Sequence, residues 1–168
     1  MIDKCLILYK GDKLAGSFYV LVGVVLIFFS IGLYLFTTSV GYLYLSIGLA
    51  VFSLYCIGKG SYIMYTSHLK MEYFQKLSDL DNSAINAEIA FTEFRIYKKN
   101  RNRTRYTRVV ILSSVIAFAG LFTSEKGLIS GTAIPIAFIS GLEIGIGLLT
   151  EFRLREYLRI LNKHRATF

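Results

Sequence analysis

The chain of 168 residues is long enough for one ordinary domain, and it carries a formal net charge of +8. Hydrophobic residues make up 54% of it, and its mean hydropathy of +0.53 is higher than soluble domains usually reach. These values exclude an ordinary water-soluble domain, and the two cysteines, Cys5 and Cys56, are too few for a disulfide framework.

Most apolar residues gather in four blocks, at residues 15–36, 41–58, 109–123 and 128–150. A bilayer core about 30 Å thick needs about 20 helical residues, and the first, second and fourth blocks reach that length. The third reaches it only if Tyr106 and Thr107 are included, with Arg105 and Arg108 snorkelling towards the headgroups. We therefore predict an all-α membrane protein with four transmembrane helices arranged as two hairpins.

The first block follows Lys4, Lys10 and Lys13, as the apolar region of a signal peptide would. It is longer than such a region usually is, and no cleavage site of the A-x-A type follows it. We expect it to remain as a membrane helix.

Basic residues are distributed unevenly among the connections. All of the 19 Lys and Arg except Lys126 lie before the first block, between the second and third, or after the fourth. The positive-inside rule then places both termini and the middle segment in the cytoplasm of a multi-pass protein of the cell inner membrane. The chain divides into an N-terminal segment with the first hairpin (1–58), a cytoplasmic helical arm (59–108), the second hairpin (109–150) and a basic amphipathic C-terminal helix (151–168).

The two hairpins show a weak similarity that would make them a parallel repeat. Phe52 aligns with Phe138 when Gly41 is set against Gly127. Because glycine is common in membrane helices, chance is the favoured interpretation.

The arm is predicted to be a hairpin of two helical legs with a turn near Asp81. The apolar residues of its first leg step by three and four, at Tyr62, Tyr65, Leu69, Tyr73, Leu77 and Leu80. Aromatic surface on so short a hairpin would attract a second copy or a cytoplasmic protein partner. The alternative is that the two legs simply cover each other.

A dense basic run, "KKNRNRTRYTR", ends the arm. Its cations are Lys98, Lys99, Arg101, Arg103, Arg105 and Arg108. We interpret them as a basic patch for the anionic headgroups of the lipid bilayer or for a protein partner. A basic run also suits nucleic acid, but no RNA-binding motif accompanies it and few aromatic residues interleave with it, so no nucleic-acid partner is expected.

The fourth block carries two patterns. Small residues recur every four positions and predict a helix-packing ridge, formed by Ala133, Ala137, Gly141 and Gly145. Polar residues lie on nearly the opposite face, at Thr132, Ser140, Glu143 and Thr150. A carboxyl group at this depth lines an aqueous ion pathway, pairs with a counter-charge such as Lys59, or stays protonated in a packed bundle. We favour the pore, which requires a homo-oligomer because one four-helix bundle fills its own centre.

The C-terminal helix alternates basic and apolar residues, so it would lie on the membrane surface or pack against the arm, and the surface is favoured. No nucleophile–base set or metal-ligand spacing is present, so neither an enzyme nor a cofactor is expected. Arg159 and His164 form an R-x-x-x-x-H motif that resembles the catalytic motif of HEPN ribonucleases. Ile160 stands where that family usually has a polar residue, so we interpret the match as a solvated tail.

The segments "RNRTRYTRVVILSS" and "GLEIGIGLLTEFRLREYL" each join a basic or charged helix to a membrane hairpin. In this they weakly resemble small membrane effectors of bacterial phage defence, both the SLATT type and the four-helix proteins associated with CRISPR nucleases. The resemblance covers about residues 95–165, and SLATT proteins match only one hairpin. It implies an oligomeric effector that perturbs the membrane. The sequence thus predicts a pore-forming protein, with a non-conducting anchor that recruits a cytoplasmic partner as the alternative.

Overall fold

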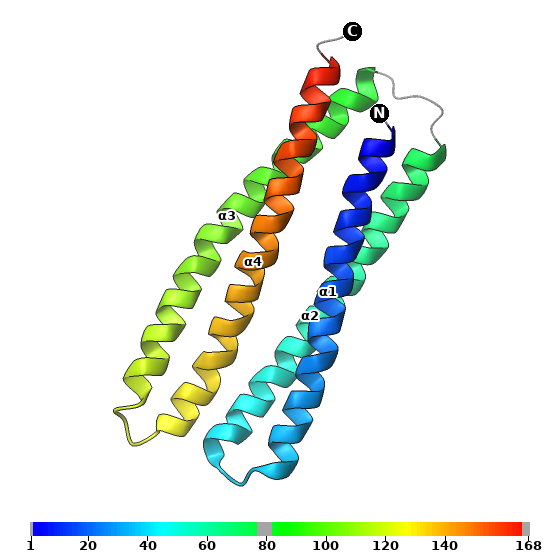
Figure 1. Ribbon diagram of the computed structural model, residues 1–168. Helices are drawn as coiled ribbons and strands as arrows, with labels where there is room; N and C mark the ends of the chain where they lie inside the picture. Colours follow the sequence, from blue (N-terminus) through cyan, green and yellow to red (C-terminus); the bar gives the residue numbers. More distant parts are fainter. Residues whose placement is uncertain (1, 77–81, 166–168) are drawn as a thin grey trace.

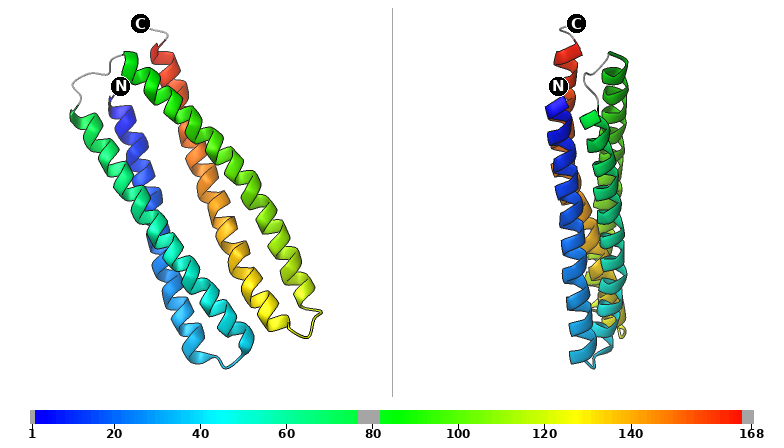
Figure 2. Two further views of the ribbon diagram at one scale, coloured as in Figure 1. Left: turned by 180° about the vertical axis from the view of Figure 1, so that it is seen from behind. Right: turned by 90° about the vertical axis from the view of Figure 1, so that its right-hand side faces the viewer.

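Four long α-helices form the part of the chain that the computed structural model describes, residues 2–76 and 82–165 (Figure 1). They are α1 (Ile2–Phe36), α2 (Val40–Lys76), α3 (Asn82–Gly120) and α4 (Lys126–Arg165). The helix α2 packs along α1 and the helix α3 along α4, so the fold consists of two antiparallel pairs (Figure 2). The start of α1, the end of α2, the start of α3 and the end of α4 lie at one end of the bundle, which we call the terminal end. The predicted turn at Asp81, and Leu77 and Leu80, lie outside the described residues.

Small side chains bring α1 and α2 into close contact. The buried positions of α2 include Ser46, Ser53, Gly60, Ser67 and Phe74, spaced seven residues apart. A seven-residue repeat keeps one seam facing the partner helix, as in a left-handed coiled coil.

Two glycines of α1 show how close this approach is. A Cβ atom added to Gly16 would lie 2.8 Å from the carbonyl oxygen of Gly60, and one added to Gly23 would lie 2.9 Å from that of Ser53. Glycine and serine at these positions therefore let the backbones approach, as small residues do between membrane helices.

The distribution of polarity is the reverse of that in a soluble bundle. Large apolar side chains cover the outside of the first pair; Phe28, for example, is 70% exposed and Leu35 is 68% exposed. The buried positions beside them hold Ser30 and Ser46, and the Ser30 hydroxyl donates a hydrogen bond to the Ser46 carbonyl. An apolar exterior of this extent requires a cover, and lipid supplies one.

Three helices of the described chain, α1, α2 and α4, are long and apolar enough to cross a membrane, where four were predicted. The helix α3 is not among them. Its apolar part begins at Val109 and the helix ends at Gly120, while the basic run precedes it directly. The chain is thus an all-α membrane protein in which α1, α2 and α4 are long and apolar enough to span a membrane and α3 is mostly polar.

All four helices meet at the terminal end. The buried apolar cluster there draws on each of them, with Cys5, Leu8, Tyr9, Phe74, Ile85, Ile89, Leu154, Tyr157 and Leu161 as its members. Residues 151–165 continue α4 without a break and pack against the other helices through Leu154, Tyr157 and Leu161. This is the second of the two positions considered for the C-terminal helix. The legs of the arm do not run along each other; they run along α1 and α4.

A second apolar cluster lies midway along the bundle and joins α1, α2 and α4, through Tyr19, Leu26, Cys56, Ile139 and Ile146. Beyond it, the parallel helices α2 and α4 meet through glycine. A Cβ atom on Gly127 would lie 3.0 Å from the Gly41 Cα atom, and one on Gly48 would lie 2.8 Å from the Pro135 ring. The two glycines that align in the sequence comparison are thus in contact in space.

Candidate functional site

The carboxylate of Glu143 lies inside the bundle and is 6% exposed. Its Oε1 atom forms a salt bridge with the Lys59 ammonium of α2. The Tyr55 hydroxyl, one turn before Lys59, donates a second hydrogen bond to Oε1 over 3.1 Å. Of the three interpretations of this carboxyl group, the structure brings together the pair with Lys59.

Aromatic rings surround the cation of this pair. The Lys59 Nζ atom lies 4.9 Å from the ring centroid of Tyr19 and 5.4 Å from that of Tyr55. Cation–π attraction adds about 0.5–2 kcal/mol at such sites. Moving charges out of water costs several kcal/mol per ion, and these contacts offset part of that penalty in addition to the salt bridge.

The remaining polar residues of α4 do not converge on a shared channel within this chain. Ser140 and Thr150 are buried, and the Thr150 hydroxyl donates to the Ile146 carbonyl of its own helix. Thr132 is exposed, and its hydroxyl donates to the carbonyl of Leu128. The polar stripe is therefore split between the interior and the surface.

The predicted packing ridge of α4 is also divided. Ala133 is buried and Ala137 half-buried, towards the end where Gly41 and Gly127 meet. Gly141 and Gly145 are exposed, and a Cβ atom added to either would find open space. Within one chain, these two glycines contact no other helix.

Three more buried carboxylates lie at the terminal end, and sequence reasoning did not single them out. Asp12 accepts a hydrogen bond from Arg95 at 2.5 Å, and Arg153 lies 3.8 Å from its other oxygen. This carboxylate is 5% exposed and contacts guanidinium groups from both helices of the second pair. Its position within "KGDK" gives no periodic signal, so only the fold reveals its role.

The other two buried carboxylates, Glu88 and Glu151, are also in contact with cations or hydrogen-bond donors. Glu88 accepts a hydrogen bond from the Tyr9 hydroxyl at 2.6 Å and lies 3.9 Å from the Lys70 ammonium. Glu151 contacts Arg103 at 2.8 Å and Arg155 at 2.7 Å. A carboxylate this buried remains charged only when cations or donors surround it.

The basic run of α3 divides into two sets. Arg103 faces inward to Glu151, and Lys99 is half-buried between the Glu143 and Asp12 clusters. Burial, and then repulsion from Lys59, lowers the pKa of Lys99 below its usual value.

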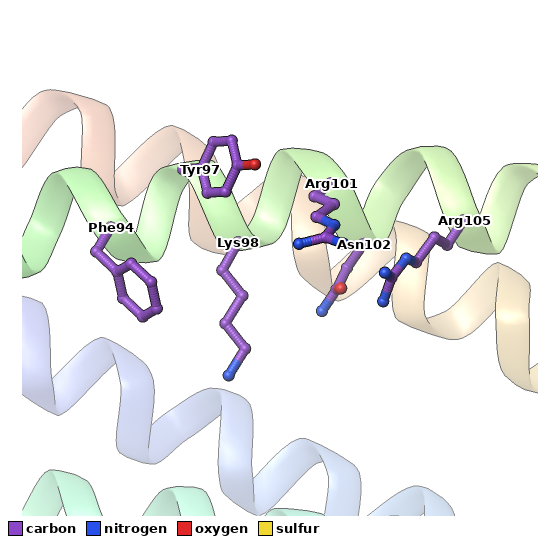
Figure 3. A pocket seen from close by; sticks show the side chains of 6 residues that line it. All are labelled: Phe94, Tyr97, Lys98, Arg101, Asn102 and Arg105. Atoms are coloured by element: carbon purple, nitrogen blue, oxygen red, sulfur yellow. The ribbon is translucent and has the colours of Figure 1, made fainter.

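The second set faces outward. Lys98, Arg101 and Arg105 line an open pocket together with Phe94, Tyr97 and Asn102, and Figure 3 shows most of these side chains on one side of α3. Arg108 is exposed one turn further on. The sequence pattern predicted one basic patch of six cations. In the structure, some of these side chains face the other helices and the rest face outward.

No family model, no curated protein sequence and no solved structure matches this chain.

Proposed function

We propose that the protein is a non-conducting membrane anchor that recruits a cytoplasmic protein through its arm. In this arrangement the apolar end of α3 enters the membrane as a fourth crossing, and its flanking arginines reach the headgroups. The protein lies in a bacterial inner membrane with both termini on the cytoplasmic side, in agreement with the positive-inside rule. The C-terminal half of α4 supports the arm.

The observation that carries this proposal is a group of exposed apolar side chains on the arm. We call Leu69, Tyr73, Phe91 and Phe94 the arm patch; they are 46%, 52%, 41% and 60% exposed. The Lys70 Nζ atom lies 6.0 Å from the Tyr73 ring and 4.8 Å from the Phe91 ring, so α2 and α3 contribute to one surface. Clustered aromatic side chains with an adjacent cation are typical of protein–protein contact sites.

The state of Glu143 supports a non-conducting interior. Its charge is balanced by Lys59 within the same chain, and the cation lies against the Tyr19 ring. An ion pathway through one copy would require this pair to open, at a cost of about 3–5 kcal/mol for an unpaired buried charge.

Photo-crosslinking in cells tests the anchor directly. A benzoylphenylalanine residue replaces Tyr73 or Phe94, and a control variant carries it at Phe28, which is 70% exposed but lies in an apolar block. The anchor predicts an adduct with a soluble protein from Tyr73 and Phe94 and none from Phe28. Adducts of the protein with itself alone from the arm patch would contradict recruitment of a separate partner.

A homo-oligomeric pore is the second candidate, and the open face at Gly141 and Gly145 favours it, because small residues promote contact between copies in lipid. The resemblance to phage-defence effectors implies the same activity. Native mass spectrometry of the protein in nanodiscs gives the copy number. A ring of four or more copies, with ion flux that changes in Glu143→Gln, would replace the anchor by the pore; a monomer or dimer would exclude the pore.

A further inference from the structure

We propose that the pocket on α3 is a binding site for one anionic phospholipid, with Arg101 and Arg105 on its phosphate and Lys98 at the rim. This inference rests on the proposed membrane placement of α3, and the pocket shares only Phe94 with the arm patch. It assigns a discrete lipid site to part of the basic run, where a diffuse attraction to headgroups would involve all six cations.

Charge and geometry favour a phosphate group. Arg101 and Arg105 are one turn apart and line the same pocket, into which Asn102 adds an amide donor (Figure 3). Within the described residues, Lys98, Arg101 and Arg105 form no ion pair, while the neighbouring Arg103 is held by Glu151. Guanidinium groups bind phosphate oxygens through paired N–H donors, so free arginines in a pocket match this anion.

The position along α3 favours a lipid as the source of that phosphate. The exposed apolar part of the helix starts at Val109, about 6 Å beyond Arg105 at 1.5 Å per residue. Leu112 and Ile116, seven and eleven residues after Arg105, lie on the same helical face and are 62% and 45% exposed. A phospholipid placed with its phosphate at the arginines would lay its acyl chains along these side chains.

The residues of the pocket fit other anions less well. Free phosphate would use the arginines and leave the adjoining apolar face without a role. An acidic protein segment or a nucleic acid would extend over more surface, yet the outward-facing cations of the pocket come from α3 alone. A lipid uses both the charged and the apolar part of this helix.

The test is native mass spectrometry of the full chain released from phosphatidylcholine nanodiscs with and without phosphatidylglycerol. Two variants carry the same change of charge: Arg101→Gln/Arg105→Gln removes two of the three pocket cations, and Arg159→Gln/Lys163→Gln removes two exposed cations near the end of α4. At about 1 kcal/mol per basic residue, the pocket variant should hold phosphatidylglycerol about thirtyfold more weakly, while the control should retain it. The proposed site would be overturned if both variants lost phosphatidylglycerol equally, or if neither variant lost it.

Two further measurements test separately whether the bound anion is a lipid and whether α3 lies in the membrane. If phosphatidylglycerol stays bound in excess inorganic phosphate, the result supports a lipid-binding pocket. If phosphate or an oligoglutamate peptide displaces phosphatidylglycerol, the result overturns that proposal. Labelling of Leu112→Cys in proteoliposomes by a membrane-impermeant maleimide tests placement alone. A labelled Leu112→Cys refutes the proposed fourth crossing and the site with it; a protected residue without lipid selectivity refutes only the site.

Discussion

Lys59 of α2 and Glu143 of α4 form a salt bridge that ties one helical pair to the other. The two residues are 84 positions apart in the chain, and the Tyr55 hydroxyl contacts both the ammonium and the carboxylate at 3.1 Å. A charge pair at this depth holds α2 and α4 in one register, because any slip separates charges that have little access to water.

Removing one partner of this pair should be costly, and removing both should not. We expect Glu143→Gln to lower the free energy of unfolding by about 3–5 kcal/mol, since Lys59 would lose its counter-charge inside the bundle. The double variant Lys59→Met/Glu143→Leu should recover most of that loss. Thermal unfolding in detergent of the two singles and the double gives the coupling energy. Additive losses would mean that the two side chains do not interact.

The close contact of α1 with α2 predicts strong sensitivity at Gly60. A Cβ atom there would lie 2.6 Å from the Gly16 carbonyl oxygen and 2.9 Å from the Val20 backbone nitrogen. Gly60→Val should therefore cost more than about 3 kcal/mol, beyond the usual range for overpacking, because backbone atoms cannot turn aside.

The matched control for Gly60 is Gly32→Ala on α1, where an added Cβ atom meets nothing within 4 Å. It should be neutral or stabilise the helix by up to about 1 kcal/mol. Both values come from the same thermal unfolding measurement. Equal destabilisation by the two substitutions would contradict the small-residue seam.

Lys99 should destabilise the fold when it is charged. Its pKa is lowered, first by burial, so the unfolded chain binds the proton more tightly than the folded one. The penalty is present in full below the lowered pKa and disappears as pH rises towards the unfolded value, near 10.5. Lys99→Met should raise Tm by a few degrees at neutral pH, and the difference from the parent protein should shrink in alkaline buffer. A difference that grows with pH would contradict this sign.

The sequence predicted the helical character and the positions of the apolar blocks, because length and hydropathy decide both. It also included the pair of Lys59 and Glu143 among its alternatives. It did not find the seam through Gly16, Gly23 and Gly60, since in a membrane helix the lipid-facing positions are the most apolar and the contact positions the smallest. Hydropathy therefore points away from the seam.

The buried acidic residues show a second limit of sequence reasoning. Asp12 and Glu151 lie in segments rich in Lys and Arg, where a carboxylate is expected to be solvated. Their burial depends on which distant arginines the packing of four helices brings to them. Lys98 and Lys99 are neighbours in the basic run, but the Lys98 side chain is exposed whereas the Lys99 side chain is half-buried.

The contact of Gly41 with Gly127 predicts that the two helical pairs recognise each other without being joined. We expect residues 1–78 and 79–168, expressed together as separate chains, to copurify from membranes through one affinity tag. Gly127→Leu, which would push a side chain into the Gly41 backbone, should abolish copurification while each fragment still inserts. Copurification that survives this substitution would show that the glycine contact is not required.

The polar links between the two pairs are distributed unevenly along the bundle. Among the described residues, Asp12, Glu88 and Glu143 supply the ionic links, and by the helix bounds Glu143 lies near the middle of the bundle and the other two lie towards the terminal end. At the opposite end the pairs meet through glycine backbone and the Pro135 ring. The terminal end is therefore held by ionic contacts in addition to its buried apolar cluster, whereas the opposite end is held by close backbone packing. High salt would therefore weaken the ionic contacts of the terminal end and leave the glycine contacts of the opposite end unchanged.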